Sequence, residues 1–440
     1  MRKLKSFLGG LGLILLLIAA LVGWSMLPWT VVLGLLPLLG LWLVLTRRGR
    51  QTLSITGVGL STLRQRIGAS LVVVIGIAGV VGVLVAMLAM GEGFQSTLQQ
   101  TGSDDSAIVL RGGSNAELNS VLSRDNVNVI TQAPGVARSA DGKPLASAEL
   151  SVVANLPKRS DPSVDANVPI RGVGEEAWAL RPNVEIVQGR RFKPGLRELV
   201  VGQGAMRQFA GLEVGQQLRL AGQEWSIVGE FASGDSHDSE LWGDAQTVAS
   251  AYRRGSSAQS VTVRLVSPQS FDAFKAALSS DPRLKVDVST TREYFGKQSE
   301  NLTKVIRAVG ITVGVIMAIG AIFGALNTMF AAIAARAREI ATLRAIGFRG
   351  LPVVVSVLLE TMLLALLGGL LGGLISWLIF NGYTASTLGA NFSQVVFQFK
   401  VSPTLLWMGI KWALAIGFIG GLFPAVRAAR LPVSTALREL

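Results

Sequence analysis

The sequence contains no cysteine and a single histidine, His237, among its 440 residues. Without cysteine there are no disulfides and no thiolate-bound metals, and one histidine cannot form the imidazole clusters of many zinc sites. Charge is also scarce, because only 16% of the residues are charged whereas soluble proteins carry about 25%. Since half of the residues are hydrophobic, this composition indicates a membrane protein.

Motifs of catalysis and nucleotide binding are absent as well. There is no G-x-S-x-G, H-E-x-x-H or S-x-x-K pattern. The nearest match to a phosphate-binding P-loop, at 135–144, has the wrong spacing and places Pro144 after Lys143. The segment "DSHDSE" at 235–240 could hold a metal, but a lone histidine is weak evidence and we interpret the segment as a solvated loop. We therefore expect a non-catalytic chain without a metal or cofactor of its own.

Six stretches are long and apolar enough to cross a bilayer core, which requires about 20 residues per helix. They are 7–26, 28–46, 68–91, 305–333, 352–380 and 404–424. A cleaved signal peptide is the alternative for the first, but a second span follows immediately without a small-residue cleavage site. The sequence thus predicts an α-helical membrane protein of about six spans, with a large extracytoplasmic mixed α/β domain inserted between spans three and four.

Basic residues are concentrated in alternate loops. Three precede the first span, five lie between spans two and three, four between spans four and five, and three follow the sixth, whereas the short loops on the opposite side have none between spans one and two and only Lys400 in 381–403. The positive-inside rule therefore places both termini in the cytoplasm and 92–303 outside. That segment has 22 Lys/Arg and 25 Asp/Glu, so the net charge of +13 reflects topology and lipid headgroup contact, not nucleic-acid binding.

The outer segment has the pattern of a mixed α/β domain. Short β-like runs occur at 106–111, 148–154, 198–202 and 216–231, and 260–289 predicts a strand–helix–strand unit. The turn-rich stretch 157–169 indicates a subdomain boundary, with a middle part at about 165–255. Both ends of the segment have helical patterns that continue into spans three and four, and we interpret them as stalks.

The tightest basic cluster, "ARAREIATLRAIGFRG" at 335–350, lies between two apolar runs. Ile340, Leu343 and Ile346 form an apolar ridge on a predicted helix that Gly347 and Gly350 terminate. The positive-inside rule alone would explain the arginines. A helix that seats its ridge in a groove of a cytoplasmic protein would explain the helical order as well.

These residues carry a resemblance to a known family. The stretch "ALNTMFAAIAARAREIATLRAIGFRG" at 325–350 resembles the motif of the FtsX-like, MacB-type ABC transporter permeases, the type VII or mechanotransmission group. Residues 358–376, the tail "PAVRAARLPVSTALREL" and "GRRFKPGLRELVVG" at 189–202 are similar to further motifs of that family. The resemblance covers about residues 55–440, which leaves the first two spans as an addition to four core spans.

The resemblance implies the permease subunit of an ABC transporter in the bacterial cytoplasmic (inner) membrane. Two copies of a cytoplasmic ABC ATPase would bind ATP and Mg, and a second permease copy or paralogue would complete the assembly, with a periplasmic adaptor as a further partner. ATP hydrolysis would move the outer domain and drive export or extraction of a substrate. The alternatives are a mechanotransmitter that regulates an extracytoplasmic enzyme, such as a cell-wall hydrolase, and a membrane sensor unrelated to ATP.

The family pattern also divides the chain into segments. They are two additional N-terminal transmembrane helices (1–50), an amphipathic cytoplasmic elbow (51–67), the first core span (68–91), the extracytoplasmic α/β domain with its stalks (92–303), the second core span (304–333), the coupling helix (334–350), the third core span (351–380), an extracytoplasmic loop (381–403), the fourth core span (404–424) and a cytoplasmic tail (425–440).

The resemblance further implies which residues lie near the ATPase. The coupling helix would contact it through Arg336, Arg338, Glu339, Ile340, Leu343, Arg344, Ala345 and Gly347. The tail residues Arg427, Arg430, Pro432 and Leu437 would lie nearby, and Asn327 with Met329 would end the preceding helix.

Polar and small residues inside the spans give the remaining candidates. Glu360 is the one acid within a span, and such an acid is a functional candidate because a buried charge is costly. We expect it to pair with a basic residue or to cap backbone, with a proton relay as the alternative. Lys411 is expected to extend to the interface. Close helix packing is predicted for the small-x-x-x-small glycines Gly368, Gly369, Gly372 and Gly373.

Overall fold

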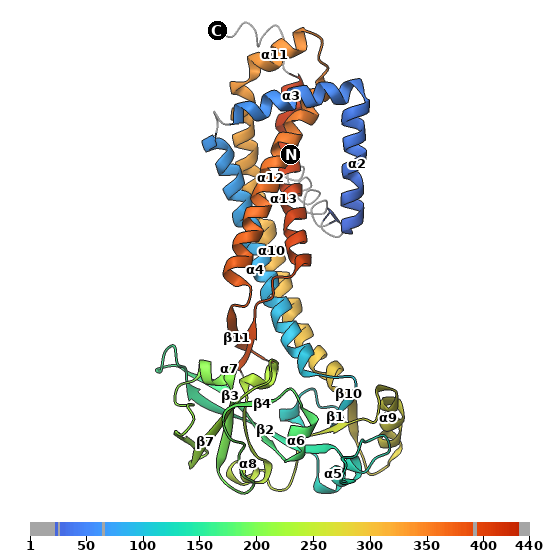
Figure 1. The fold of residues 1–440 in the computed structure, drawn as a ribbon, viewed down its shortest axis with the longest axis vertical. Helices are drawn as coiled ribbons and strands as arrows, with labels where there is room; N and C mark the ends of the chain where they lie inside the picture. Colours follow the sequence, from blue (N-terminus) through green and yellow to red (C-terminus); the bar gives the residue numbers. More distant parts are fainter. Residues whose placement is uncertain (1–22, 25–26, 64–66, 390–393, 431–440) are drawn as a thin grey trace, which may run out of the picture. The chain divides into compact units, whose positions relative to one another are not determined.

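The structure is a computed structural model that describes residues 23–24, 27–63, 67–389 and 394–430. The first predicted span, 7–26, therefore lies almost wholly outside the described residues. The chain divides into two compact units (Figure 1): a helical unit of Met1–Met90, Ile306–Asn381 and Lys400–Leu440, and an α/β unit of Gly91–Val305 and Gly382–Phe399. The boundary between the units falls within two long helices, α4 (Ile67–Thr101) and α10 (Thr291–Ala335).

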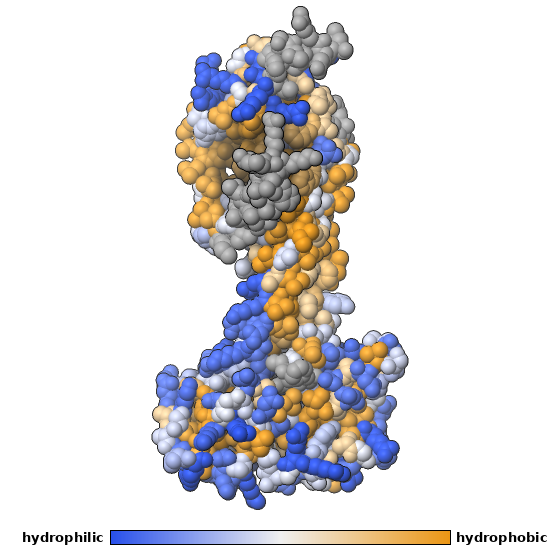
Figure 2. All heavy atoms as spheres, turned by 180° about the vertical axis from the view of Figure 1, so that it is seen from behind, coloured by the Kyte–Doolittle hydropathy of each residue, from blue (hydrophilic) through white to orange (hydrophobic). Residues whose placement is uncertain are grey.

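Four helices in the described part of the chain are long and apolar enough to cross a membrane: α4, α10, α12 (Gly350–Phe380) and α13 (Pro403–Arg430). A fifth candidate is the pair α2 (Trp29–Leu45) and α3 (Arg47–Leu63), which is bent by 96°. Figure 2 shows apolar side chains covering much of the surface of the helical unit, as expected for a surface that faces lipid. Four spans are thus supported, and the number six remains a prediction.

Glycines allow α12 to approach two neighbours closely. A Cβ at Gly372 would lie 2.4 Å from the Ala78 carbonyl oxygen of α4, and one at Gly369 would lie 2.7 Å from the Ala413 Cβ of α13. Such short distances leave no room for any side chain. The four glycines predicted to pack helices divide between these neighbours, with Gly368 and Gly372 against α4 and Gly369 and Gly373 against α13.

The α/β unit contains one ten-stranded sheet in the order β10–β1–β9–β2–β3–β8–β5–β7–β4, with β6 paired to β7. Its first half follows the order β1–α5–β2–β9–α9–β10 along the chain, and these antiparallel strands lie in the ferredoxin-like arrangement. The strands from β3 to β8 are inserted between β2 and β9. The strands are β1 (Ser106–Arg111), β2 (Ala146–Pro157), β3 (Asp165–Val173), β4 (Glu185–Gly189), β5 (Glu198–Gly202), β6 (Gln217–Leu220), β7 (Gln223–Ala232), β8 (Leu241–Asp244), β9 (Ser260–Arg264) and β10 (Val286–Thr290).

Short helices connect these strands and cover the sheet. They are η2 (Glu117–Asn119), α5 (Arg124–Thr131), α6 (Glu176–Leu180), α7 (Gln203–Gln208), η3 (Ser236–Ser239), α8 (Ala245–Ala251), η4 (Pro268–Ser270) and α9 (Phe271–Ser280). The turn-rich segment 157–169 includes the turn between β2 and β3, which pair directly within the one sheet. Separate apolar cores nevertheless fill the two halves, one around Phe274 and the other around Trp225.

The predicted loop 381–403 contains a hairpin that sequence reasoning missed. Strands β11 (Thr384–Leu388) and β12 (Gln394–Gln398) pair antiparallel and belong mainly to the α/β unit. The amide of Val396 donates to Ser239 Oγ at 2.8 Å, and the Phe397 ring packs edge-to-face on Phe94 with centroids 5.5 Å apart. The hairpin is therefore a packed element of that unit.

Candidate functional site

A short helix, α11 (Ala337–Ala345), lies in the segment predicted to be the coupling helix. Its inner side is fixed by apolar packing, because Ile340 is 5% exposed and Leu343 is half-buried in a cluster with residues of α3, α10, α12 and α13. Its outer side is open to solvent and includes Arg338 and Glu339. The helix therefore has one side anchored in its own chain and one side available to a partner.

The prediction that Ile340, Leu343 and Ile346 form one exposed apolar ridge is wrong. Each step of three residues turns the side chain by about 60° around a helix of 3.6 residues per turn. Ile340 consequently points into the core of the helical unit, whereas Ile346 is 69% exposed. Among the predicted contact residues, those exposed are Arg338, Glu339, Ala345 and Gly347, while Arg336 and Arg344 are half-buried.

Glycine ends α11 abruptly. Gly347 has a φ of +104°, a backbone conformation that other residues rarely adopt. The chain then starts α12 at Gly350. Gly347 thus ends α11 as the sequence predicted, whereas Gly350 is the first residue of α12 and does not terminate the preceding helix.

Arg336 and Glu360 form an ion pair that joins the start of α11 to α12. Arg336 Nη1 lies 3.1 Å from Glu360 Oε2, and the two side chains are 12% and 5% exposed. Arg336 Nε also lies 3.2 Å from Glu339 Oε2 of α11. The elbow helix α3 lies over the pair, since a Cβ at Gly59 would be 3.1 Å from the same Glu360 oxygen. Glu360 is thus paired with a basic residue, and its charge is compensated where α3, α11 and α12 meet.

The predicted end of the preceding helix is wrong. α10 continues past Asn327 and Met329 to Ala335, because the alanine-rich stretch that follows them favours a helix. Met329 is buried in the cluster that contains Ile340, whereas Asn327 is exposed on the helix surface.

Two basic residues of α13 behave differently. Arg427 is exposed near the end of the helix, and its guanidinium lies 5.3 Å from the centroid of the Phe330 ring. Lys411 is buried against its own chain: it is 7% exposed and its Nζ donates to the Leu27 carbonyl at 2.9 Å. Arg430 is exposed at the last residue of α13, and the other two predicted tail residues, Pro432 and Leu437, lie outside the described residues.

A second polar cluster is buried in the α/β unit. Arg171 of β3 is 4% exposed and donates to Glu117, Glu149 and Glu240 over distances of 2.8 to 3.0 Å. Burial alone would raise the pKa of these glutamates, but the neighbouring arginines outweigh it and lower the pKa of all three. The sequence did not reveal this cluster because its members come from distant strands and turns.

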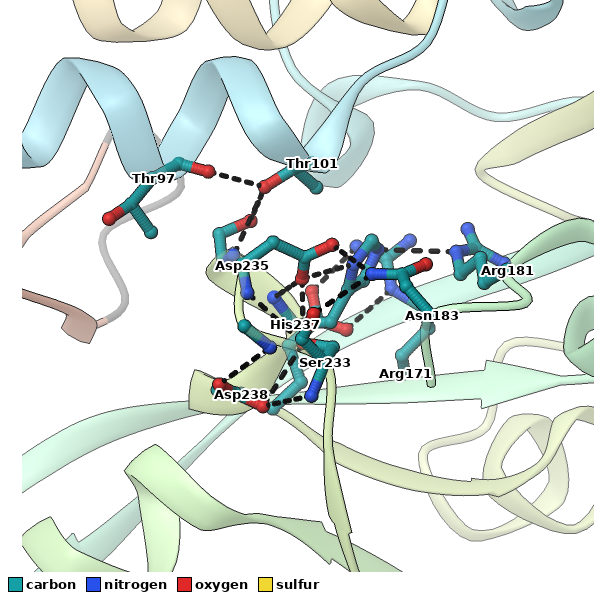
Figure 3. A network of polar contacts seen from close by, with 12 residues as sticks. Thr97, Thr101, Arg171, Arg181, Asn183, Ser233, Asp235, His237 and Asp238 are labelled. Atoms are coloured by element: carbon teal, nitrogen blue, oxygen red, sulfur yellow. Dashed lines mark hydrogen bonds and ion pairs between the residues drawn. The ribbon is translucent and has the colours of Figure 1, made fainter. Parts of the chain in front are cut away.

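His237 connects this cluster to the C-terminal end of α4 (Figure 3). Arg181 Nε donates to His237 Nε2 at 3.2 Å, so Nδ1 carries the ring proton and donates to Asp235 Oδ1 at 2.9 Å. The preceding residue in η3, Ser236, donates from its amide to Thr101 Oγ1 of α4 at 3.0 Å. The segment 235–240 is thereby held on both sides.

The solvated-loop interpretation of 235–240 is wrong, because His237 is 2% exposed and Asp235 is 5% exposed. Both ring nitrogens of His237 already have protein partners. Within the described residues, no group of three or more His, Asp or Glu side chains is placed to hold a metal ion. The geometry therefore indicates a structural network, which charged partners from other strands stabilise.

Known proteins resemble both parts of the chain. Residues 70–281 match the model of the MacB-like periplasmic core domain, and residues 311–433 match that of the FtsX-like permease C-terminal region. The Macrolide export ATP-binding/permease protein MacB of Shewanella oneidensis is 25% identical over 377 residues, which are 76% of this chain and 56% of that protein. The protein of the same name from Vibrio parahaemolyticus is 25% identical over 372 residues, 76% of this chain and 55% of that protein. The chain thus spans about half the length of the curated relatives it matches.

Among solved structures, the periplasmic region of MacB from Actinobacillus actinomycetemcomitans aligns with a TM-score of 0.34 and 15% identity, covering 48% of this chain and 97% of that one.

Proposed function

This chain belongs to the FtsX/MacB-type ABC transporter permeases, and from that premise we propose that it couples ATP hydrolysis in a partner to motion of its α/β unit. The observation that carries the proposal is the division of α11 into two sides. Ile340 and the Arg336–Glu360 pair fix the helix to its own unit, while Arg338, Glu339 and Ile346 stay exposed. A helix fixed in this way can transfer a push from a docked protein to the spans.

We propose that the docked protein is a cytoplasmic ABC ATPase present in two copies, which binds the ATP and the Mg. A second permease chain, either a copy or a paralogue, would complete the assembly. The positive-inside pattern supports an orientation in the bacterial inner membrane with α11 and both termini in the cytoplasm and the α/β unit outside. Neither ATP nor Mg is expected to bind the residues described for this chain.

The proposed task is export or extraction of a substrate. Its support is the printed name of the relatives, which are macrolide export proteins, together with the match of 70–281 to their periplasmic core domain. A periplasmic adaptor is a proposed partner of the α/β unit. Regulation of a cell-wall hydrolase is the alternative task, and it would use the same coupling through α11.

The experiment is co-purification of the full chain from membranes in mild detergent. A P-loop ATPase should elute with the wild-type chain in a two-to-two ratio. The pair of changes Arg338→Glu and Ile346→Asp should release it, because Arg338 is exposed on α11, Ile346 is exposed directly after it, and their loss leaves the core intact. Arg47→Glu, an exposed charge reversal in α3, is the matched control and should retain the ATPase. Retention by the double variant would exclude the outer side of α11 as the docking surface.

A further inference from the structure

The ten-stranded sheet has β10 at one end, and at the other end β4 and β6 both pair with β7. β4 has a register shift between Ile186 and Gln188 in its pairing with β7. β10 instead pairs with β1 without interruption from Val286 to Thr290, and no strand of the described chain pairs with its other side. Bulges protect many natural edges from pairing with foreign strands. The regular register of β10 lacks this protection.

The hydrogen bonding of β10 reveals which backbone groups face outward. Gly112 N donates to Lys285 O at 2.7 Å, so these opposite residues form a hydrogen-bonded pair of the antiparallel ladder. Such pairs alternate along a ladder, and the next one therefore includes Asp287. Val286 and Val288 fall between them, so their N–H and C=O groups point away from β1.

A contact on the far side of β1 agrees with this assignment. Arg111 lies opposite Val286, and its amide donates to Ser120 Oγ at 2.9 Å, away from β10. The free edge of β10 accordingly offers two N–H donors and two C=O acceptors at a spacing of two residues.

A groove of about 970 Å³ lies along this edge. Lys275 and Ser279 of α9 line it together with β10, and Tyr294, Gln298 and Asn301 of α10 line it as well. Tyr294 and Gln298 share a side-chain hydrogen bond within this lining.

We propose that β10 is a docking edge for an extended segment of a second polypeptide, which adds a strand to the sheet. Backbone donors and acceptors that alternate at this spacing match those of another extended polypeptide. Lipids and sugars do not repeat donors and acceptors at the same spacing. The charged residues that line the groove balance each other, since Lys275 and Lys297 stand against Asp287 and Glu293. The segment is therefore recognised through its backbone, and it carries little net charge within the groove.

The test uses the full chain in lipid nanodiscs and a defined probe. The probe is an acetylated and amidated hexapeptide with the sequence of β1, SAIVLR, which forms an extended strand against the inner edge of β10 in this sheet. Hydrogen exchange with fragment-resolved mass spectrometry measures the amides of Val286 and Val288. The probe should slow their exchange in a dose-dependent manner, and a probe that is N-methylated at alternate residues should not.

Two variants make the assignment specific. Val286→Pro removes one outward N–H at the first residue of the strand without removing a ladder donor, and it should weaken probe binding at least tenfold. Asn301→Trp fills the groove from an exposed position of α10 and should block the probe, whereas Glu300→Trp on the same helix lies outside the groove and should not. The proposal would be overturned if the probe bound all three variants equally, or if about 1 mM probe gave no protection of β10. Neither result depends on whether the chain binds an ATPase.

Discussion

Removing the guanidinium of Arg336, the residue that precedes α11, should loosen that helix. The pair with Glu360 is largely buried, with side chains 12% and 5% exposed, and breaking a buried pair costs about 3–5 kcal/mol. Arg336 retains some contact with water, so we take the lower end, about 3 kcal/mol, for Arg336→Gln. Glu360→Gln should cost less, about 1 kcal/mol, because Arg336 keeps its contact with Glu339.

The assay is hydrogen exchange of the α11 amides in the full chain in nanodiscs. A loss of about 3 kcal/mol in local opening free energy corresponds to roughly a hundredfold faster exchange, since 1.4 kcal/mol is tenfold. The control is Arg338→Gln, which removes an exposed arginine from the same helix and should leave exchange unchanged. The exchanged pair Arg336→Glu with Glu360→Arg should recover part of the protection. If Arg336→Gln and Arg338→Gln behave alike, the ion pair does not anchor α11.

Two further outcomes follow from the packing and from the pKa shifts. Gly372→Ala should destabilise the full chain by about 1–3 kcal/mol, because its Cβ would meet a backbone oxygen at 2.4 Å, and the melting temperature in detergent should fall accordingly. Gly373→Ala is the control and should be tolerated, because its Cβ would meet only the flexible end of Leu406 at 3.3 Å. The α/β unit should lose stability as the pH falls below the ordinary glutamate pKa of 4.5. Folding lowers the pKa of Glu117, Glu149 and Glu240, so their ionised forms stabilise the unit fully above that pH. This stabilisation is lost once the three glutamates are protonated. Urea unfolding followed by tryptophan fluorescence measures this slope, and Arg171→Gln should both destabilise the unit by about 3–5 kcal/mol at neutral pH and reduce the slope.

Much of the fold could be predicted because its signals are local. Long apolar runs specify α4, α10, α12 and α13, and the strand–helix–strand pattern at 260–289 corresponds to β9, α9 and β10. The missed strands had weaker local patterns. β3 contains Pro169, and β8 has only four residues, so their pairing within the sheet decides their structure.

The errors at the candidate sites have a common physical origin. The segment 235–240 resembles a solvated acidic loop because its partners, Arg171 and Arg181, lie elsewhere in the sequence. Ile340 was assigned outward for the same reason, since burial depends on neighbours that a single helix does not reveal. Glu360 was easier to interpret, because an acid within a span needs a partner wherever that partner comes from.

The contacts of α11, α12 and α4 bear on the proposed coupling. Arg336 links the start of α11 to α12 through Glu360, and α12 contacts α4 so closely at Gly372 that neither helix can slide past the other without a clash. α4 is one uninterrupted helix from Ile67 to Thr101, and its last residue accepts the amide of Ser236 beside the buried His237 network. Each link is either a buried charge pair, a contact without space for a methyl group or a satisfied polar network, and such contacts have few alternative arrangements. We therefore expect a displacement of α11 to move α12 and, through the contact at Gly372, the part of α4 that lies in the helical unit. Loosening any one of these links should weaken the coupling without removing the exposed side of α11 to which a partner binds.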